Sequence, residues 1–181
     1  FLCAGALGGE TEITGLSLDS RQSDRALTDI LKAFGADIKC GSSVSVCKSE
    51  LFGITVDISQ CPDLFPTLAV TACAAHGDTV FTNAARLRIK ESDRIEAVEK
   101  MITSLGGFAE STPDSLTVHG TGTLAGGEVN SFNDHRIVMA AAVAACICES
   151  PVIIRDAQAV NKSYPDFFED YKKLGGKADV I

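Results

Sequence analysis

The segment at residues 94–107 reads RIEAVEKMITSLGG and predicts an amphipathic helix that ends at a glycine. The apolar side chains Ile95, Val98 and Ile102 recur at helical spacing, and the charged residues between them fall outside that face. Gly106 supplies the residue type that most often ends a helix. We therefore expect one apolar side of this helix to pack on a core.

The same pattern occurs three times along the chain. Amphipathic helices are also expected at 26–36 and 165–177, and the three glycine stops are spaced by 71 and then 69 residues. An apolar segment rich in Ala and Cys and then a short strand precede each of these helices. The apolar helices are expected at 1–7, 67–75 and 137–148, and the strands at 10–16, 78–84 and 150–157. A period of about seventy residues indicates a supersecondary unit repeated three times.

The repeat predicts one α/β domain over residues 1–181 with approximate threefold symmetry. The units are expected at about 1–50, 51–125 and 126–181. Helices that are apolar all round must be buried, so three buried helices should be surrounded by sheets and outer helices. A doubly wound α/β sheet is the alternative. It leaves the repeat unexplained, and the sequence contains no GxGxxG or Walker loop.

Composition excludes several classes of protein. The net charge of −8 argues against nucleic acid or an anionic membrane as the main partner. The longest apolar run, at 137–148, is too short to span a bilayer. Seven scattered cysteines without a CxxC spacing indicate a reducing compartment and no structural zinc or other metal site. Because the chain begins without Met, we expect it to be cut from a longer protein.

A basic cluster stands at residues 86–96, RLRIKESDRIE, where a helix is expected to begin. Asp93 is interpreted as a structural cap paired with Glu96. Lys90, Glu91 and Arg94 are not needed for that cap. Because a helix N-terminus attracts anions, these residues suggest a phosphate or carboxylate clamp. The alternative is a solvated helix start held by salt bridges.

A second motif, SFNDHRIVMAAA, begins at residue 131. Asn133 or Asp134 is expected to cap the buried helix, which places His135 and Arg136 in its first turn. Cations in that position oppose the helix dipole unless an anion lies there. A lone His is more often structural, but the His-Arg pair favours ligand binding.

Two further residues are candidates through their positions. Asp63, in QCPDLFPTLAV, begins a buried helix and is either a dipole partner or a site residue. Lys162, in AVNKSYPDFF, is expected in a loop before an outer helix, where lysine is usually solvated. Helix starts in equivalent places of the repeat should gather on one face. Such a face would combine acid–base groups with anion-binding cations.

Together, RLRIKESDRI, FNDHRIVMA, CPD before a buried helix and NKSYPDFF resemble the 5-enolpyruvylshikimate-3-phosphate synthase family over nearly the whole chain. The resemblance implies the C-terminal globule, built from three βαβαββ-type units, of a two-domain enolpyruvyl transferase. It implies transfer of the enolpyruvyl group of phosphoenolpyruvate to shikimate-3-phosphate with release of phosphate, on the route to aromatic amino acids. The implied setting is cytoplasmic, with no metal or organic cofactor, and the implied partners are the two substrates and the missing N-terminal domain.

The resemblance also implies residue roles. Asp63 would take the proton of the attacking sugar hydroxyl, and Lys90 would lie beside the shikimate phosphate. Glu91 would take part in proton transfer at the enolpyruvyl methylene. The residues implied to bind phosphoenolpyruvate are Arg94, His135, Arg136 and Lys162, of which Lys162 is also a candidate proton donor. With half of the site missing, we expect the chain alone to be inactive.

Two other functions stay open from the sequence. One is the related transferase that acts on UDP-N-acetylglucosamine. The other is a non-catalytic anion-binding module built on the same repeat.

Overall fold

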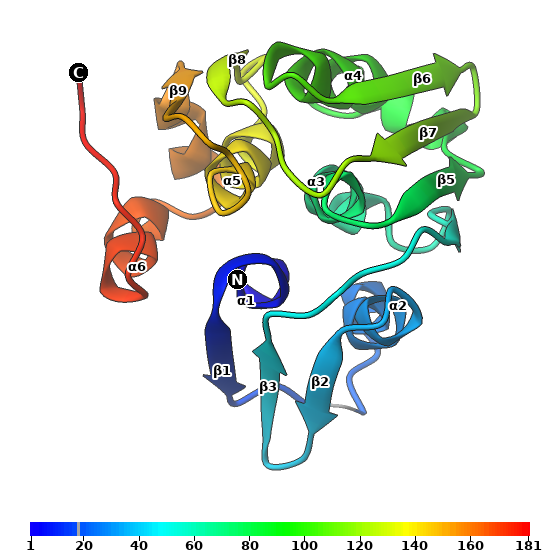
Figure 1. Cartoon of the computed structure of the whole chain (residues 1–181), viewed down its shortest axis with the longest axis vertical. Helices are drawn as coiled ribbons and strands as arrows, with labels where there is room; N and C mark the ends of the chain where they lie inside the picture. The colour runs from blue at the N-terminus through cyan, green and yellow to red at the C-terminus, as the bar shows by residue number, and fades with distance from the viewer. Residues whose placement is uncertain (18) are drawn as a thin grey trace.

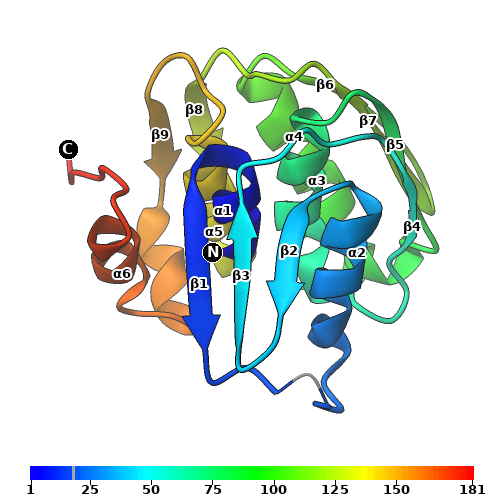
Figure 2. The same ribbon diagram turned by 60° about the horizontal axis from the view of Figure 1, so that its bottom comes forward.

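Three short helices occupy the centre of the molecule: α1 (Leu2–Gly8), α3 (Phe65–Cys73) and α5 (His135–Ala144) (Figures 1 and 2). The computed structural model describes residues 1–17 and 19–181. Most residues of the three helices are buried, and each helix contacts the other two. Because their side chains are mostly small, the helices can approach one another closely. Burial of the three apolar helices was predicted from their composition and is confirmed.

In the described part of the chain, three sheets surround these helices. The first sheet has the order β1-β3-β2 and is antiparallel, with β1 at Glu10–Thr14, β2 at Asp37–Cys40 and β3 at Ser43–Cys47. The second has the order β4-β5-β7-β6, with β4 at Thr55–Asp57, β5 at Gly77–Thr82, β6 at Phe108–Thr112 and β7 at Ser115–Gly120. The third pairs β8 (Gly127–Asn130) with β9 (Val152–Arg155).

Two of the buried helices connect parallel strands. β4 and β5 pair in parallel on either side of α3 in the sequence, with Thr55 opposite Val80. β8 and β9 pair in parallel on either side of α5, with Val129 opposite Ile154. Both are therefore βαβ units, which is the arrangement expected of an α/β fold. The outer helices are α2 (Leu27–Ala33), α4 (Arg94–Ser104) and α6 (Phe167–Lys173).

The described residues also form four 3-10 helices: η1 (Ser23–Ala26), η2 (Pro62–Leu64), η3 (Ala85–Ile89) and η4 (Ala157–Lys162). η4 lies where the sequence predicts a loop, whereas η2 lies where Asp63 was expected to begin a buried helix. η2 leads directly into α3, and η4 leads towards α6. Both carry candidate site residues, Asp63 and Lys162.

The helix predicted over residues 137–148 was too long. α5 ends at Ala144, and the chain turns back through hydrogen bonds from Cys146 N to Val143 O and from Ile147 N to Ala144 O. Cys148 then forms a parallel β-bridge with Leu124. A long-range strand contact thus ends the helix before the apolar run does.

The three outer helices end in the same way. Gly35, Gly106 and Gly175 have φ angles of 97°, 84° and 95°, in the left-handed region. The amide that follows each glycine donates to the carbonyl five residues back; the bond from Gly107 N to Ile102 O is 2.9 Å long. This is the Schellman motif, and it confirms the predicted glycine stops.

Replacing Gly106 with alanine should lower the free energy of unfolding by about 1–2 kcal/mol, because a side chain disfavours the left-handed conformation. The new Cβ would also lie 2.9 Å from the Cβ of Ala125. The urea midpoint of the chain measures the change. Gly41→Ala is the matched control, since nothing lies within 4 Å of its added Cβ. Equal shifts in the two variants would contradict the role given to Gly106.

Candidate active site

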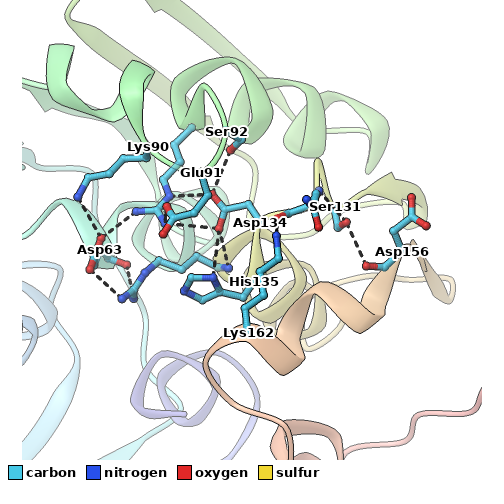
Figure 3. Close-up of polar contacts among 12 residues, drawn as sticks. Asp63, Lys90, Glu91, Ser92, Ser131, Asp134, His135, Asp156 and Lys162 are labelled. Carbon is cyan, nitrogen blue, oxygen red and sulfur yellow. Dashed lines mark hydrogen bonds and ion pairs between the residues drawn. The ribbon is translucent and has the colours of Figure 1, made fainter.

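Asp63 lies among three cationic side chains just before α3 (Figure 3). Its carboxylate accepts hydrogen bonds from Arg94 Nη1 at 2.8 Å and from Arg136 Nη2 at 2.8 Å. Lys90 Nζ lies 3.7 Å from the same carboxylate. The side chain keeps 35% of its surface exposed, so a ligand can reach it.

Asp93 caps α4, as predicted. Its carboxylate accepts from the backbone N–H of Glu96 at 3.1 Å and from Arg88 Nη1 at 2.8 Å. The reciprocal half of a capping box is absent, because the Glu96 side chain instead accepts from Lys100. Arg88 also donates to the carbonyls of Thr112 and Pro113. Arg88 therefore has a structural role, although it belongs to the basic cluster seen in the sequence.

Arg94, the first residue of α4, is the most deeply placed cation of the cluster. Its side chain is 1% exposed and donates to three carboxylates. Nε bonds Asp134 at 2.9 Å, Nη1 bonds Asp63, and Nη2 bonds Glu91 at 2.5 Å. The predicted contact between Arg94 and phosphoenolpyruvate stays a prediction, since the guanidinium is already held by carboxylates of the chain.

Asp134 belongs to this cluster of charged side chains, although the sequence analysis considered it only as a possible cap. It was one of two possible caps, and it does cap α5 by accepting from Arg136 N at 2.9 Å. It also accepts from Arg94 Nε and from Ser92 Oγ at 3.0 Å, and it is fully buried. Burial raises the pKa of Asp134, but its hydrogen bonds, led by that from Arg94, hold the pKa below its usual value. The sequence placed Asp134 at the start of a helix that was expected to be buried, and a carboxylate in such a place requires a cationic partner.

His135 and Arg136 occupy the first turn of α5, as predicted. Arg136 Nη1 donates to the backbone carbonyl of Asp63 at 3.0 Å, in addition to its bond with the carboxylate. Arg136 Nε and His135 Nδ1 are buried and have no hydrogen-bond partner among the described residues. Buried polar atoms without partners cost free energy, so these two nitrogens favour a ligand-binding role for this turn.

Lys162 ends the 3-10 helix η4, whereas the sequence predicted a loop. Its Nζ donates to the backbone carbonyl of Asn133 at 2.6 Å. This contact brings Lys162 to the turn that precedes α5 (Figure 3). The structure therefore gathers all of the predicted site residues in one region, from the starts of α3, α4 and α5 and the end of η4.

The gathered side chains carry a small positive surplus. Four cations, Lys90, Arg94, Arg136 and Lys162, face three carboxylates, those of Asp63, Glu91 and Asp134. Burial lowers the pKa of His135, which favours its neutral form at pH 7. The region thus carries about one net positive charge in a chain of net charge −8. Partly exposed cations can bind an anion, and the two partly exposed carboxylates, those of Asp63 and Glu91, can exchange protons with it.

Stability should fall as the pH is lowered, in two separate windows. The lowered pKa of His135 contributes stability that is complete above about pH 6.5 and is lost as the pH falls through the folded value. The lowered pKa values of Asp63 and Asp134 contribute stability that is lost only below about pH 3.9. Urea midpoints measured between pH 7.5 and pH 3 should show both losses. His135→Gln should flatten the first window alone; an unchanged first window would contradict this assignment.

Among the described residues, no helix is long and apolar enough to cross a membrane. All seven cysteines are free, and the described part of the chain holds no group of three or more His, Cys, Asp or Glu residues suited to a metal ion.

An α/β fold whose buried helices α3 and α5 begin at a cluster of cations and carboxylates is of the enolpyruvyl transferase-like class. The family model described as EPSP synthase (3-phosphoshikimate 1-carboxyvinyltransferase) matches residues 1–171. The chain belongs to this family, which confirms the resemblance inferred from its motifs.

Named relatives support the same assignment. The chain is 47% identical over 180 residues to the 3-phosphoshikimate 1-carboxyvinyltransferase of Clostridium novyi, and it covers 41% of that protein. It is 43% identical over 181 residues to the protein of the same name from Clostridioides difficile, again covering 41%. These alignments include 99% of the chain. The chain therefore spans about two fifths of the length of these relatives.

A solved structure gives the comparison of folds. The EPSP synthase of Acinetobacter baumannii superposes with a TM-score of 0.87 at 28% identity, over 97% of this chain and 44% of that one. A second structure of the synthase from the same organism gives 0.85 at 26% identity. The predicted fold class is confirmed.

Proposed function

We propose that this chain is the C-terminal globule of an enzyme that transfers the enolpyruvyl group of phosphoenolpyruvate to shikimate-3-phosphate and releases phosphate. The observation that carries the proposal is the convergence of Asp63, Glu91, Arg136 and Lys162, far apart in the sequence, on one cationic site. The names of the relatives point to the same reaction. As one domain of that enzyme, residues 1–181 would supply one wall of the site.

The reaction requires a base, an acid and cations. The sugar hydroxyl adds to C2 of phosphoenolpyruvate as its proton leaves, and a proton is added to the methylene carbon. Loss of phosphate and of a methyl proton from the tetrahedral intermediate then regenerates the double bond. Asp63 is the proposed base for the hydroxyl, and Glu91 and Lys162 are proposed to exchange protons at the methylene carbon. The surrounding cations stabilise the negative charge on phosphate and carboxylate.

Ligand binding should change the basicity of Asp63. Burial raises the pKa of Asp63, but Arg136, Arg94 and Lys90 outweigh this effect and keep the pKa low. A carboxylate held by three cations is a weak base. An anionic substrate that takes over hydrogen bonds from Arg136 would weaken this hold and raise the pKa. We propose that Arg136 and His135 bind phosphoenolpyruvate together with Arg94 and Lys162, and that Lys90 lies beside the phosphate of the sugar.

The chain alone is expected to release no phosphate from the substrate pair. Both reactants must be held in position, and one wall of a site cannot do this. The measurement compares the purified chain with a protein of the relatives' full length that contains it (the full-length enzyme) at equal concentration. Turnover by the chain above the no-protein background would contradict the proposed division of the site.

Phosphate release by the full-length enzyme tests the proposed reaction. Phosphoenolpyruvate is supplied with shikimate-3-phosphate in one reaction and with UDP-N-acetylglucosamine in another. Release with shikimate-3-phosphate alone is the expected result. Release with the nucleotide sugar alone would reassign the substrate, and release in neither reaction would favour a non-catalytic anion-binding module. We further propose that the enzyme works in the cytoplasm and without a metal, so a chelator should leave the rate unchanged.

A further inference from the structure

The turn that precedes α5 has an unusual backbone. Phe132 and Asn133 have φ angles of 52° and 55°, both in the left-handed region. Asparagine adopts this conformation more readily than most residues, whereas an aromatic residue there is rare. Two such residues in succession persist only where neighbouring groups hold them in place.

Two side chains hold this turn: the Asn130 Oδ1 atom accepts from Phe132 N at 2.6 Å, and the buried Ser131 hydroxyl forms two further hydrogen bonds. Ser131 is fully buried, and its Oγ accepts a hydrogen bond from Asn133 N at 3.1 Å. The same Oγ donates to the backbone carbonyl of Asp156 at 3.2 Å (Figure 3). The Ser131 carbonyl accepts from Asp134 N at 2.9 Å, next to the cap of α5. The hydroxyl therefore donates one hydrogen bond to Asp156 and accepts one from Asn133, and it links these two segments.

Both hydrogen-bond partners of the Ser131 hydroxyl are connected to Lys162. Asp156 is the N-cap residue of η4, whose last residue is Lys162. Asn133, in its left-handed conformation, presents its carbonyl to Lys162 Nζ at 2.6 Å. Hydrogen bonds thus connect Ser131 to Asn133 and Asn133 to Lys162. The backbone of η4 connects Lys162 to Asp156, which is hydrogen-bonded to Ser131.

We infer that Ser131 is a positioning residue that fixes Lys162 relative to the first turn of α5. The inference rests on the proposed function, because it gives Ser131 a part in the same reaction. Alanine would fill almost the same volume but would supply neither a donor to Asp156 nor an acceptor for Asn133. Loss of the Ser131 hydroxyl would therefore affect the orientation of Lys162 more than the packing around residue 131.

A double-mutant cycle in the full-length enzyme tests the inference. Ser131→Ala should lower kcat on the order of 10- to 100-fold, the cost of a small misplacement of a reacting group. KM for shikimate-3-phosphate should change little. Lys162→Met should lower kcat further, and adding Ser131→Ala to it should cause no additional loss, because the serine acts through the lysine. Thr71→Val is the matched control: it removes a buried hydroxyl that donates to Thr67 O at 3.0 Å, and kcat should be unchanged.

The outcomes separate this inference from the proposed function. A wild-type rate in Ser131→Ala with a deficient Lys162→Met overturns the inference and leaves the function intact. Additive losses in the double variant overturn it as well. A wild-type rate in Lys162→Met instead overturns the role proposed for Lys162 in the reaction. A crystal structure of the Ser131→Ala chain gives a readout independent of activity: we expect Lys162 Nζ to leave Asn133 O, and an unchanged 2.6 Å contact would contradict the inference.

Discussion

Replacing Asp63 with asparagine in the full-length enzyme is expected to lower kcat by about 10²- to 10⁴-fold, the usual contribution of a general base. The amide cannot accept the proton of the sugar hydroxyl. Asparagine keeps the shape of the side chain and one oxygen that can accept from Arg94 or Arg136, so the site should stay folded. Steady-state phosphate release measures the loss.

The same variant should bind anions at least as tightly as the wild type. In the chain as it stands, the Asp63 carboxylate competes with a ligand for Arg136. Removing its charge leaves that guanidinium more available. Titration of the purified chain with phosphoenolpyruvate, followed by NMR, compares the affinities. Loss of rate with retained binding is the signature of a base, whereas equal losses of both would indicate local collapse.

The control for Asp63 is another aspartate that hydrogen-bonds at a distance from the site. Asp57 accepts from Ser59 N and from Asn83 Nδ2 and is exposed. Asp57→Asn should leave both kcat and anion binding unchanged. A normal rate in Asp63→Asn would remove Asp63 from the proposed chemistry.

Replacing Asp134 with alanine is expected to lower the free energy of unfolding by about 3–5 kcal/mol, as is usual when one partner of a buried ion pair is removed. Arg94, at 1% exposure, would lose the partner of its Nε. Ser92 Oγ and Arg136 N would lose the same acceptor. Urea denaturation of the chain measures the change.

Two further variants define the origin of this effect. Asp93→Ala removes an aspartate cap from α4 that is partly exposed, and it should cost only about 1 kcal/mol. Adding Arg94→Met to Asp134→Ala should recover part of the loss, because no unpaired charge then remains buried. Equal costs for the two aspartates, or no recovery in the double variant, would contradict the importance of the buried pair.

Local patterns in the sequence predicted the parts of the fold that depend on local interactions. Apolar composition identified the three central helices, and the glycines at 35, 106 and 175 identified the ends of the outer ones. The α5 boundary was wrong, because the bridge between Leu124 and Cys148 is a contact across the chain. The 3-10 turn that carries Lys162 was missed, since single turns have little periodicity to detect.

The candidate site was predictable as a set of residues but not as a network. Charged residues at helix starts drew attention to Asp63, Arg94 and Arg136 one segment at a time. The pairing of Arg94 with Asp134 joins residues 40 apart, and no local pattern specifies it. The left-handed backbone at Phe132 has no sequence signal either, because its side chain type argues against that conformation. The roles of these residues in the reaction stay predictions.

The placement of the strand pairings has a mechanical consequence. Each of the three sheets in the described part of the chain lies within one of the units expected at about 1–50, 51–125 and 126–181. The second and third of these units contact each other through α3 and α5 and through the β-bridge between Leu124 and Cys148. Packed helices can move past one another by small shear motions, whereas a β-bridge resists such motion. The candidate site lies at the junction of the second and third units, because Asp63 belongs to the second unit and its partner Arg136 to the third. A ligand that separates these two side chains would therefore act directly on the junction between the two units.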